Sequence, residues 1–260
     1  MFKTLLSTIG AYKLYEKWLW RQVKGGAKPE HIAIILDGNR RWASERELSP
    51  WLGHEKGADK VENLIDWCLA AGVKAITLYA FSTENFARSK DEIEELLRII
   101  EKRFRKILTD ERVHKNRVQV RVIGRTSLLP RSLQKLIDDV QTTTKDYNKH
   151  FLTFAFAYGG RAEIVDAARK IAEKACKGEL RIDNIDEKTF EQNLYTSYMP
   201  NQDPDLIIRT SGEERLSGFL LWQSAYSELC FLDVFWPDFR KIDLLRAVRT
   251  FQSRKRRFGT

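Results

Sequence analysis

Hydrophobic residues in this chain follow two alternating patterns, which predict strands and helices in turn. Uninterrupted apolar runs at residues 32–36 and 73–81 predict strands that are buried on both faces. Residues 53–72 between them carry apolar side chains three and four positions apart and end at Gly72, which is typical of a helix. Helices placed between strands in this way indicate a parallel sheet.

The alternation continues into the C-terminal half. Residues 89–107 predict a long helix with a wide apolar stripe, which begins at a capping box formed by Ser89 and Glu92. Residues 117–124 alternate apolar and polar side chains, as a half-exposed or edge strand does. Strands are also predicted at residues 151–158, 205–210 and 229–234, and helices after Pro130 and at residues 162–177. We therefore expect an α/β fold, a single domain over residues 29–260 with a central, mainly parallel six-stranded sheet flanked by helices.

Residues 1–28 form a separate amphipathic segment. Lysine and arginine side chains surround apolar positions at helical spacing, namely Phe2, Leu5, Leu6, Ile9, Tyr12, Tyr15 and Leu19. Such a helix either lies on an anionic membrane surface through residues 1–24 or packs on its own domain. It is not a secretory signal, because charged residues interrupt the apolar stretch and no cleavage site follows.

Composition and charge narrow the setting. The chain has 260 residues, 43% of them hydrophobic, which suffices for a substantial core. A net charge of +9 indicates an anionic partner, whether nucleic acid, a membrane surface or a phosphorylated substrate. Cys68, Cys176 and Cys230 lack the spacing of a zinc site, so we expect reduced core thiols in a cytoplasmic protein. The sequence contains no run of 18 apolar residues, so we expect no membrane span.

The first predicted strand ends in residues that suit an anion. The apolar run stops at Asp37, and Gly38, Asn39, Arg40 and Arg41 follow. Ligands of open α/β sheets bind beyond the carboxyl ends of strands, where glycine lets backbone N–H groups approach an anion. A carboxylate beside two arginines suits a magnesium-bridged diphosphate. An ordinary turn with solvated arginines is the alternative.

Two further strand ends carry similar chemistry. Residues 82–88 follow the second strand with hydroxyls, an amide and Arg88, and residues 209–217 follow another with two arginines and small polar side chains. A second acid, Glu228, comes after a mostly apolar stretch. Three such clusters at one sheet edge are hard to explain as independent solvated loops, so we predict that they share one site.

These segments belong to a set of motifs that resembles a known family. The chain is similar to cis-prenyltransferases of the undecaprenyl diphosphate synthase type over residues 30–260. The motifs are HIAIILDGNRRWA, GHEKGA, LYAFSTENFARS, AYGGRAEIVDA, DLIIRTSGEERLSGFLLWQSAYSEL and the ending WPDF…RRFG. The resemblance implies a homodimeric enzyme with a hydrophobic tunnel, which condenses isopentenyl diphosphate with an allylic diphosphate primer to give a medium-to-long cis-polyprenyl diphosphate. The DDxxD motif of trans-type synthases is absent, because Asp138-Asp139 is followed by Val140, Gln141 and Thr142.

The resemblance also implies roles for individual residues. Asp37 would be the catalytic acid associated with Mg²⁺, and Glu228 the acid of the second magnesium site. Asn85 holds the position usually given a proton-acceptor role. A carboxamide has negligible basicity near pH 7, so we favour the departing diphosphate or a bound water as acceptor, oriented by Asn85. Substrate-binding positions would be Gly38, Asn39, Arg40, Arg41, Trp42, His54, Ser82, Thr83, Glu84, Phe86, Arg88, Arg209, Arg215, Leu216 and Ser217. The ending Arg257-Phe258-Gly259 resembles one that completes the neighbouring subunit's active site in some members.

The chain departs from the bacterial pattern of this family. Arg40 and Phe86 replace a glycine and a tryptophan, as in archaeal and eukaryotic relatives. Pro50 stands where bacterial enzymes hold a diphosphate-binding arginine, and proline donates no hydrogen bond. Arg40 and Arg46 are the candidates to replace that arginine.

The predicted tunnel wall consists of the helix at residues 93–107 and of inward residues on the strands that begin at residues 73 and 151. Phe154 and Phe156 share one face of the second of these strands, where bulky rings would shorten a tunnel. We therefore expect a product of medium length.

Three alternatives stay open at this point. A noncatalytic prenyltransferase subunit would typically lack the acid and arginines that this chain retains. A nucleic-acid-binding protein would carry a contiguous basic stripe with exposed aromatics, whereas these arginines sit at strand ends beside acids. Irregular coupling to another allylic diphosphate or an alcohol remains compatible with Pro50.

Overall fold

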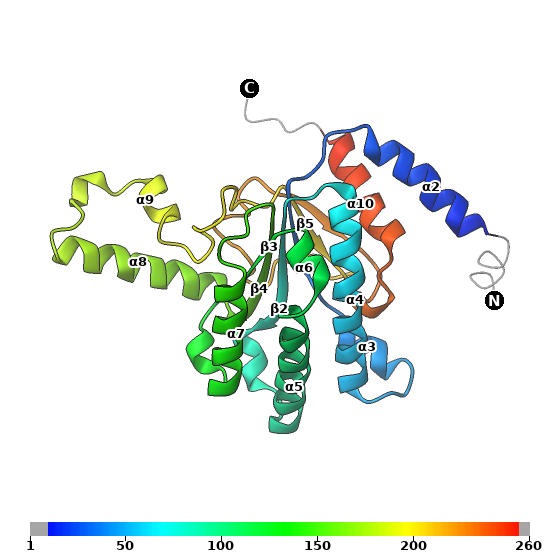
Figure 1. The fold of residues 1–260 in the computed structure, drawn as a ribbon, viewed down its shortest axis with the longest axis horizontal. Helices are drawn as coiled ribbons and strands as arrows, with labels where there is room; N and C mark the ends of the chain where they lie inside the picture. Colours follow the sequence, from blue (N-terminus) through cyan, green and yellow to red (C-terminus); the bar gives the residue numbers. More distant parts are fainter. Residues whose placement is uncertain (1–9, 255–260) are drawn as a thin grey trace.

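The computed structural model describes residues 10–254 and contains one six-stranded sheet, drawn in Figure 1. Its strand order is β3-β4-β2-β1-β5-β6, and every neighbouring pair is parallel. The strands are β1 (His31–Ile35), β2 (Ala75–Ser82), β3 (Val118–Ile123), β4 (His150–Tyr158), β5 (Leu206–Arg209) and β6 (Glu228–Phe231). The predicted six-stranded α/β fold is confirmed, and β3 is an edge strand as its alternation predicted.

Helices connect the strands and cover the sheet (Figure 1). The α-helices are α2 (Ala11–Lys24), α3 (Asn39–Ser44), α4 (Pro50–Ala71), α5 (Lys90–Ile107), α6 (Glu111–Lys115), α7 (Arg131–Thr143), α8 (Gly160–Cys176), α9 (Glu187–Glu191) and α10 (Lys241–Ser253). Short 3₁₀ helices are η1 (Thr83–Ala87), η2 (Thr126–Leu128), η3 (Ile182–Asn184) and η4 (Trp236–Asp238). Gly72 ends α4 in a left-handed conformation, as predicted.

One local prediction is wrong. Ser89 is the N-cap of α5, but its side chain makes no capping hydrogen bond. Glu92 instead accepts a hydrogen bond from Arg88 at 2.9 Å. The guanidinium competes successfully for the carboxylate that the capping box would have used, because an ionic hydrogen bond is stronger than one to a backbone amide.

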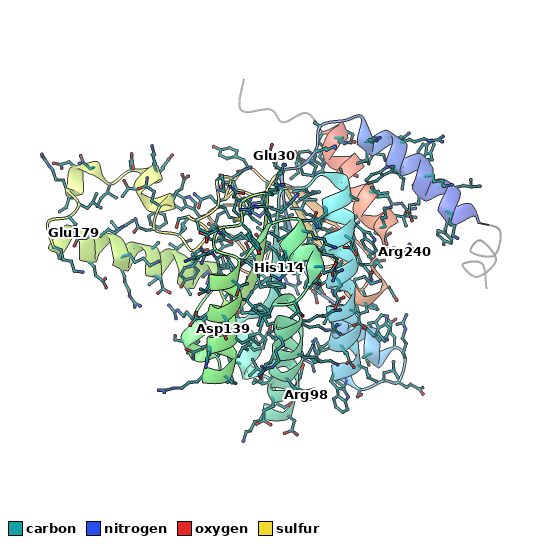
Figure 2. All side chains as sticks on the ribbon, in the orientation of Figure 1. Glu30, Arg98, His114, Asp139, Glu179 and Arg240 are labelled. Carbon is teal, nitrogen blue, oxygen red and sulfur yellow. The ribbon has the colours of Figure 1, made fainter. Side chains whose placement is uncertain are left out.

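Alternate residues of each strand face two separate cores. On one face, Ile32 and Ile34 of β1 pack with side chains of α4, α5, α7 and α10. On the other, Ala33 and Ile35 pack against Phe219 and Leu220 from the segment that precedes β6. All five residues of β1 are buried, so the predicted burial on both faces is confirmed. Figure 2 shows how densely side chains fill the layers around the sheet, whereas α8 and α9 extend away from it.

The N-terminal helix α2 lies along α10, so the described part of the amphipathic segment packs on its own domain. Leu19 and Val23 are fully buried in this contact. Glu16 forms an ion pair with Lys241 at 3.0 Å. Leu14 faces solvent with 69% of its surface exposed. The predicted apolar positions Phe2, Leu5, Leu6 and Ile9 lie outside the described residues.

The cysteines depart from prediction in one respect. All three are free, and Cys68 is buried in the core as expected. Cys176 is exposed at the end of α8, because that helix extends beyond the sheet and has no layer to cover its tip. Among residues 10–254, no helix combines the length and apolar character that crossing a membrane requires.

Candidate active site

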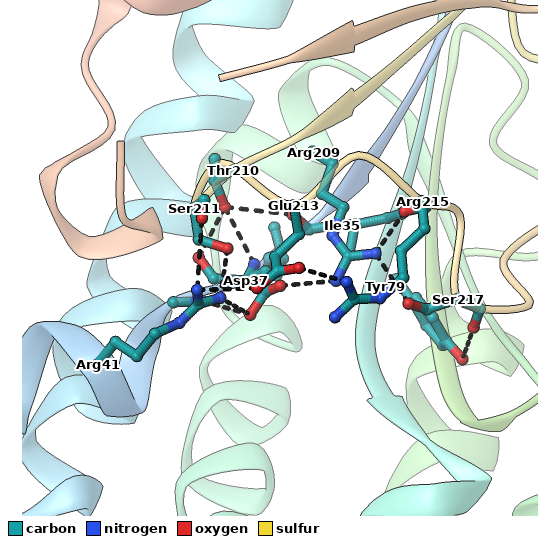
Figure 3. A network of polar contacts seen from close by, with 12 residues as sticks. Ile35, Asp37, Arg41, Tyr79, Arg209, Thr210, Ser211, Glu213, Arg215 and Ser217 are labelled. Carbon is teal, nitrogen blue, oxygen red and sulfur yellow. Dashed lines mark hydrogen bonds and ion pairs between the residues drawn. The ribbon is translucent and has the colours of Figure 1, made fainter. Parts of the chain in front are cut away.

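The strand ends singled out in the sequence meet at the carboxyl edge of the sheet. Asp37 follows β1, Ser82 ends β2, and Arg209 ends β5. Because β5 and β2 both pair with β1 in parallel register, their ends lie side by side. Figure 3 shows the resulting network around Asp37. The prediction that these clusters come together is confirmed.

Asp37 is the centre of this network. Its carboxylate accepts hydrogen bonds from Arg209 Nη2 at 2.8 Å, Arg41 Nη2 at 3.3 Å and the backbone N–H of Gly38 at 2.6 Å. Burial by itself would raise the pKa of Asp37, but hydrogen bonding and charge from Arg209, with Ser211 and Arg41, hold it below the usual value. Asp37 is therefore ionised at neutral pH and ready to bind a cation.

Only glycine fits the position after Asp37. Gly38 adopts φ 99°, and a Cβ there would approach the Phe235 ring within 2.6 Å. The turn starts α3, which carries Arg40 and Arg41 to the same edge.

Arg209 is almost fully buried, with 4% of its surface exposed. One terminal nitrogen donates to the hydroxyl of Ser217 at 2.8 Å and to the carbonyl of Arg215, and the other donates to Asp37. Its Nε is buried with no hydrogen-bond partner. A buried guanidinium with a spare donor is suited to an anionic oxygen, since a guanidinium presents five N–H groups and accepts none.

Glu213 joins the arginines on the two sides of this network. Its carboxylate accepts from Arg41 Nη1 at 3.1 Å and from Arg215 Nη1. Arg41 also donates to the Ser211 hydroxyl at 2.7 Å. Figure 3 shows Glu213 between the two guanidinium groups.

Glu92 on α5 lies close to two further arginines and to His54. It lies 2.9 Å from Arg88, 3.6 Å from Arg40 and 3.7 Å from His54. Burial, and then the charge of Arg88, lower the pKa of His54 to about 4, against the opposing effect of Glu92. His54 is therefore neutral at pH 7.

Three hollows surround these side chains. We call the first the Arg40 cleft; its wall includes Asp37, Gly38, Asn39, Arg40, Arg41, Pro50, His54 and Arg88. The second, the Arg209 cleft, includes Asp37, Ser82, Thr83, Glu84, Asn85, Arg88, Arg209 and Ser217. The third, the apolar cavity, runs between α4 and α5 and includes Val61, Leu96, Ile100, Phe104, Phe154 and Phe156. Leu36, Asn39 and His54 line all three, so the two polar clefts and the apolar cavity adjoin at these residues.

The junction of the three hollows holds unpartnered polar atoms. Asn39 Oδ1 and His54 Nε2 are both buried without a hydrogen-bond partner. Buried polar atoms in native proteins are nearly always satisfied, so these two mark a place for a ligand or water. Residues predicted to form a tunnel wall line the apolar cavity, where Phe154 and Phe156 stack at 5.6 Å between ring centroids and contact Phe104 of α5.

The loop after β2 is held by its own side chains. Ser82 and Asn85 form a reciprocal capping box around η1, in which Asn85 Oδ1 accepts from the Ser82 backbone N–H at 2.9 Å. Phe86 packs edge to face on Phe81 at 4.9 Å and is not part of either cleft wall. Asn85 thus has its carboxamide oxygen already occupied.

Other predicted positions lie apart from the clefts. Trp42 donates its indole N–H to Asp238 at 2.9 Å on the outer side of α3. Leu216 packs against the second core, the one around Phe219.

Glu228 is not brought to Asp37 within one chain. Glu228 pairs with Leu206, which pairs with Ile32, five positions before Asp37. At about 3.3 Å per residue this separates them by roughly 16 Å along the strands. Glu228 instead binds Arg254 at 2.6 Å. A magnesium ion shared by Asp37 and Glu228 of the same chain is therefore excluded.

Some residues of the site were not predicted. Gly159 and Gly160, at the start of α8, line the Arg209 cleft together with Arg161. The signal was present, since they follow the end of β4 as Asp37 follows β1. The buried Glu163 anchors this helix start by accepting hydrogen bonds from Tyr158 and from the Tyr195 backbone N–H. Glu92 and Glu213 gave only part of a signal, because Arg88 and Arg215 are near them in sequence but Arg40, His54 and Arg41 are distant.

Known proteins explain this arrangement. A family model described as "Putative undecaprenyl diphosphate synthase" matches residues 35–259. The chain belongs to this family of cis-prenyltransferases. It is therefore a transferase that acts on prenyl groups.

Individual members of the cis-prenyltransferase family are similar over nearly the whole chain. A tritrans,polycis-undecaprenyl-diphosphate synthase (geranylgeranyl-diphosphate specific) of Methanopyrus kandleri is 55% identical over 95% of this chain and 91% of its own. The protein of the same name from Pyrococcus horikoshii is 52% identical over 96% and 94%. Lavandulyl diphosphate synthase from Lavandula x intermedia, crystallised with dimethylallyl diphosphate, has a TM-score of 0.86 and 41% identity, over 90% of this chain and 99% of that one.

The low pKa of His54 predicts a pH dependence of stability. The unfolded chain binds a proton on histidine near pH 6.5, but folded His54 does so only near pH 4. The contribution of His54 to the free energy of unfolding is therefore fully present above pH 6.5. It falls by on the order of 3 kcal/mol as the pH drops toward 4. Urea unfolding of the wild type and of His54→Gln at several pH values measures this. The variant is expected to lose less stability on acidification, and equal losses would contradict the assignment.

Proposed function

We propose that this cis-prenyltransferase condenses isopentenyl diphosphate with geranylgeranyl diphosphate and extends it to a cis-polyprenyl diphosphate of undecaprenyl length. The observation that carries the proposal is the meeting of two arginine-lined clefts with one apolar cavity at Leu36, Asn39 and His54. Two diphosphates and one growing hydrocarbon require such an arrangement. Curated relatives more than half identical over nearly the whole chain carry this activity in their names, which supports the choice of primer and product.

The Arg40 cleft suits the diphosphate of the allylic primer. Arg40, Arg41 and Arg88 converge on it from α3 and from the loop after β2. Guanidinium groups bind phosphate oxygens in pairs of parallel hydrogen bonds. The primer's hydrocarbon would then pass His54 into the apolar cavity.

The Arg209 cleft suits isopentenyl diphosphate. Arg209 and Ser217 line it, and the Arg215 carbonyl receives a hydrogen bond from Arg209. The N-terminus of α8 adds the positive end of a helix dipole beside this cleft, while the N–H of Gly160 itself donates to the Gly218 carbonyl at 2.7 Å.

Asp37 fits Mg²⁺ as the single protein carboxylate of a site completed by substrate. Mg²⁺ is usually held by one or two carboxylates together with phosphate oxygens and water. In residues 10–254, no group of three or more acidic, histidine or cysteine side chains forms a metal cage. When bound, Mg²⁺ would neutralise charge on the diphosphate oxygens.

The reaction follows from these positions. The allylic C–O bond breaks, and its electron pair leaves with the diphosphate, whose negative charge Arg40, Arg41 and Arg88 stabilise. The π electrons of isopentenyl diphosphate then form the new C–C bond to the allylic carbon. A proton leaves the neighbouring carbon and restores a double bond. The apolar cavity excludes water from the carbocation. Asn85, with its oxygen occupied by Ser82, orients the departing diphosphate or a water that accepts the proton.

Arg40 replaces the arginine that is missing at Pro50. Both residues line the Arg40 cleft. Arg46 is unsuited to this role, because it binds Asp238 at 2.9 Å and stacks on Trp42 outside the cleft.

We further propose that the enzyme is a homodimer whose C-terminal Arg257-Phe258-Gly259 completes the partner's site. Arg254, the last described residue, is held by Glu228 at the opposite sheet edge from Asp37. A tail that starts there is better placed to serve a neighbouring subunit than its own clefts. A metal role for Glu228 would belong to such a dimer.

In this proposal residues 29–260 form the catalytic domain. The exposed face of α2 rests on an anionic membrane surface. Leu14 and Trp18 are exposed on one face of α2, at a spacing of four residues. Lys13, Lys17 and Arg21 form a parallel basic stripe. Exposed apolar and basic stripes together favour anionic bilayers. A nucleic-acid partner is not supported, because the arginines of the clefts pair with carboxylates.

Incubation with labelled isopentenyl diphosphate, Mg²⁺ and primers of several lengths tests the activity. We expect regular cis-polyprenyl diphosphates from geranylgeranyl diphosphate, identified by mass. Asp37→Asn should lower the rate at least about 100-fold, since a charge-stabilising group of this kind contributes that much. Asp183→Asn on the exposed η3 is the matched control. No product from any primer would refute the proposal, and a branched product would favour irregular coupling.

Phe156→Ala is expected to lengthen the products, because it removes a ring from the inner wall of the apolar cavity. Mass analysis of products from the same primer measures the change. Leu133→Ala is the control, since Leu133 is equally buried in this core but does not line the cavity. Identical product lengths in Phe156→Ala and wild type would refute the length-limiting role of this ring.

Leu14→Glu is expected to reduce binding to anionic vesicles several-fold, because it places a negative charge in the exposed apolar stripe. Flotation with phosphatidylglycerol-containing vesicles measures the bound fraction. Leu128→Glu, at an exposed leucine of η2, is the control. Equal flotation of the two variants would exclude α2 as the contact.

A further inference from the structure

Glu213 links an arginine of the Arg40 cleft to an arginine beside the Arg209 cleft. Its carboxylate holds Arg41 of the Arg40 cleft at 3.1 Å and Arg215 beside the Arg209 cleft (Figure 3). Both guanidinium groups thereby donate to a carboxylate the N–H groups that could bind a phosphate. One internal anion therefore occupies hydrogen-bond donors that two diphosphates would use.

Glu213 differs in this respect from Asp37, which also contacts two arginines. Asp37 is fixed by the backbone N–H of Gly38 at 2.6 Å and by the buried Arg209. Glu213 has side-chain partners only, and they are exposed by 45% for Arg41 and 62% for Arg215. Ion pairs so open to water are weak and easily exchanged. A diphosphate carries more charge than a carboxylate and would displace Glu213.

Displacement at one cleft affects the other. Once a diphosphate takes Arg41, the bridge is broken and Glu213 can turn toward solvent, which leaves Arg215 available. The binding free energy of the first diphosphate is thus reduced by the full free energy of displacing Glu213, and that of the second is reduced only a little. Such a shared cost makes the binding of the two ligands cooperative, with equal effects in both directions.

We propose that Glu213 is a placeholder carboxylate that holds Arg41 and Arg215 in position and couples the binding of the two diphosphate substrates. This rests on the proposed function, because it takes the two clefts as the two substrate sites. Glu213 is a positioning residue in this proposal and touches neither reacting carbon.

Calorimetric titration tests the coupling without turnover. Isopentenyl diphosphate is titrated with Mg²⁺ into the free protein and into protein saturated with geranylgeranyl thiolodiphosphate, an unreactive analogue of the primer. In the wild type, the analogue should tighten isopentenyl diphosphate binding. In Glu213→Gln, binding to the free protein should already be tighter by on the order of fivefold, and the analogue should add little.

The neighbouring Glu214 supplies a matched control. Glu214→Gln removes the same charge one residue away on an exposed side chain, so it should behave like the wild type. Thermal unfolding of both variants checks that they are folded. Glu213→Gln that binds isopentenyl diphosphate no more tightly than the wild type, or that keeps the full effect of the analogue, overturns the proposal. A wild type that binds neither ligand refutes the proposed function instead.

Discussion

The Asp37–Arg209 ion pair is the contact on which the architecture of the site depends. It joins the ends of β1 and β5 at 2.8 Å, and Arg209 continues to Ser217 on the next loop. Both side chains lie where burial destabilises an unpaired charge, so each stabilises the charged form of the other. Because the pair is formed at the edge of a parallel sheet, it fixes an acid and a cation at the place where the clefts open.

Acidic and basic side chains of the site pair with one another. Arg41 and Arg209 bind Asp37, Arg41 and Arg215 bind Glu213, and Arg40 and Arg88 lie beside Glu92. Without these acids, several guanidinium groups would repel one another within a small space. The balance keeps the guanidinium groups close together, and under the proposed function it would make substrate binding an exchange of anions.

The combination of polar clefts with an apolar cavity follows from how the layers pack. The cavity runs between α4 and α5 over β2 and β4, and Ala80 lines both this cavity and the Arg209 cleft at an irregularity in the pairing of β2 with β4. A register shift of this kind redirects side chains locally. The small side chain of Ala80 lets the Arg209 cleft and the apolar cavity approach each other at that point.

The sequence by itself determined the elements and their order, because burial on two faces and helical stripes leave periodic patterns that depend on neighbours along the chain. It also identified Asp37, Arg41, Arg88, Arg209 and Ser217, since each follows a strand that ends at the same edge. Only the tertiary structure decided which charges pair. Glu92 binds Arg88 and does not form the predicted capping box. Glu213 bridges two arginines, and Glu228 lies at the opposite edge of the sheet with Arg254. Arg88 and Arg215 are close in sequence to their acids, but the other partners are distant along the chain, and residue spacing carries no record of the distance that packing sets between them.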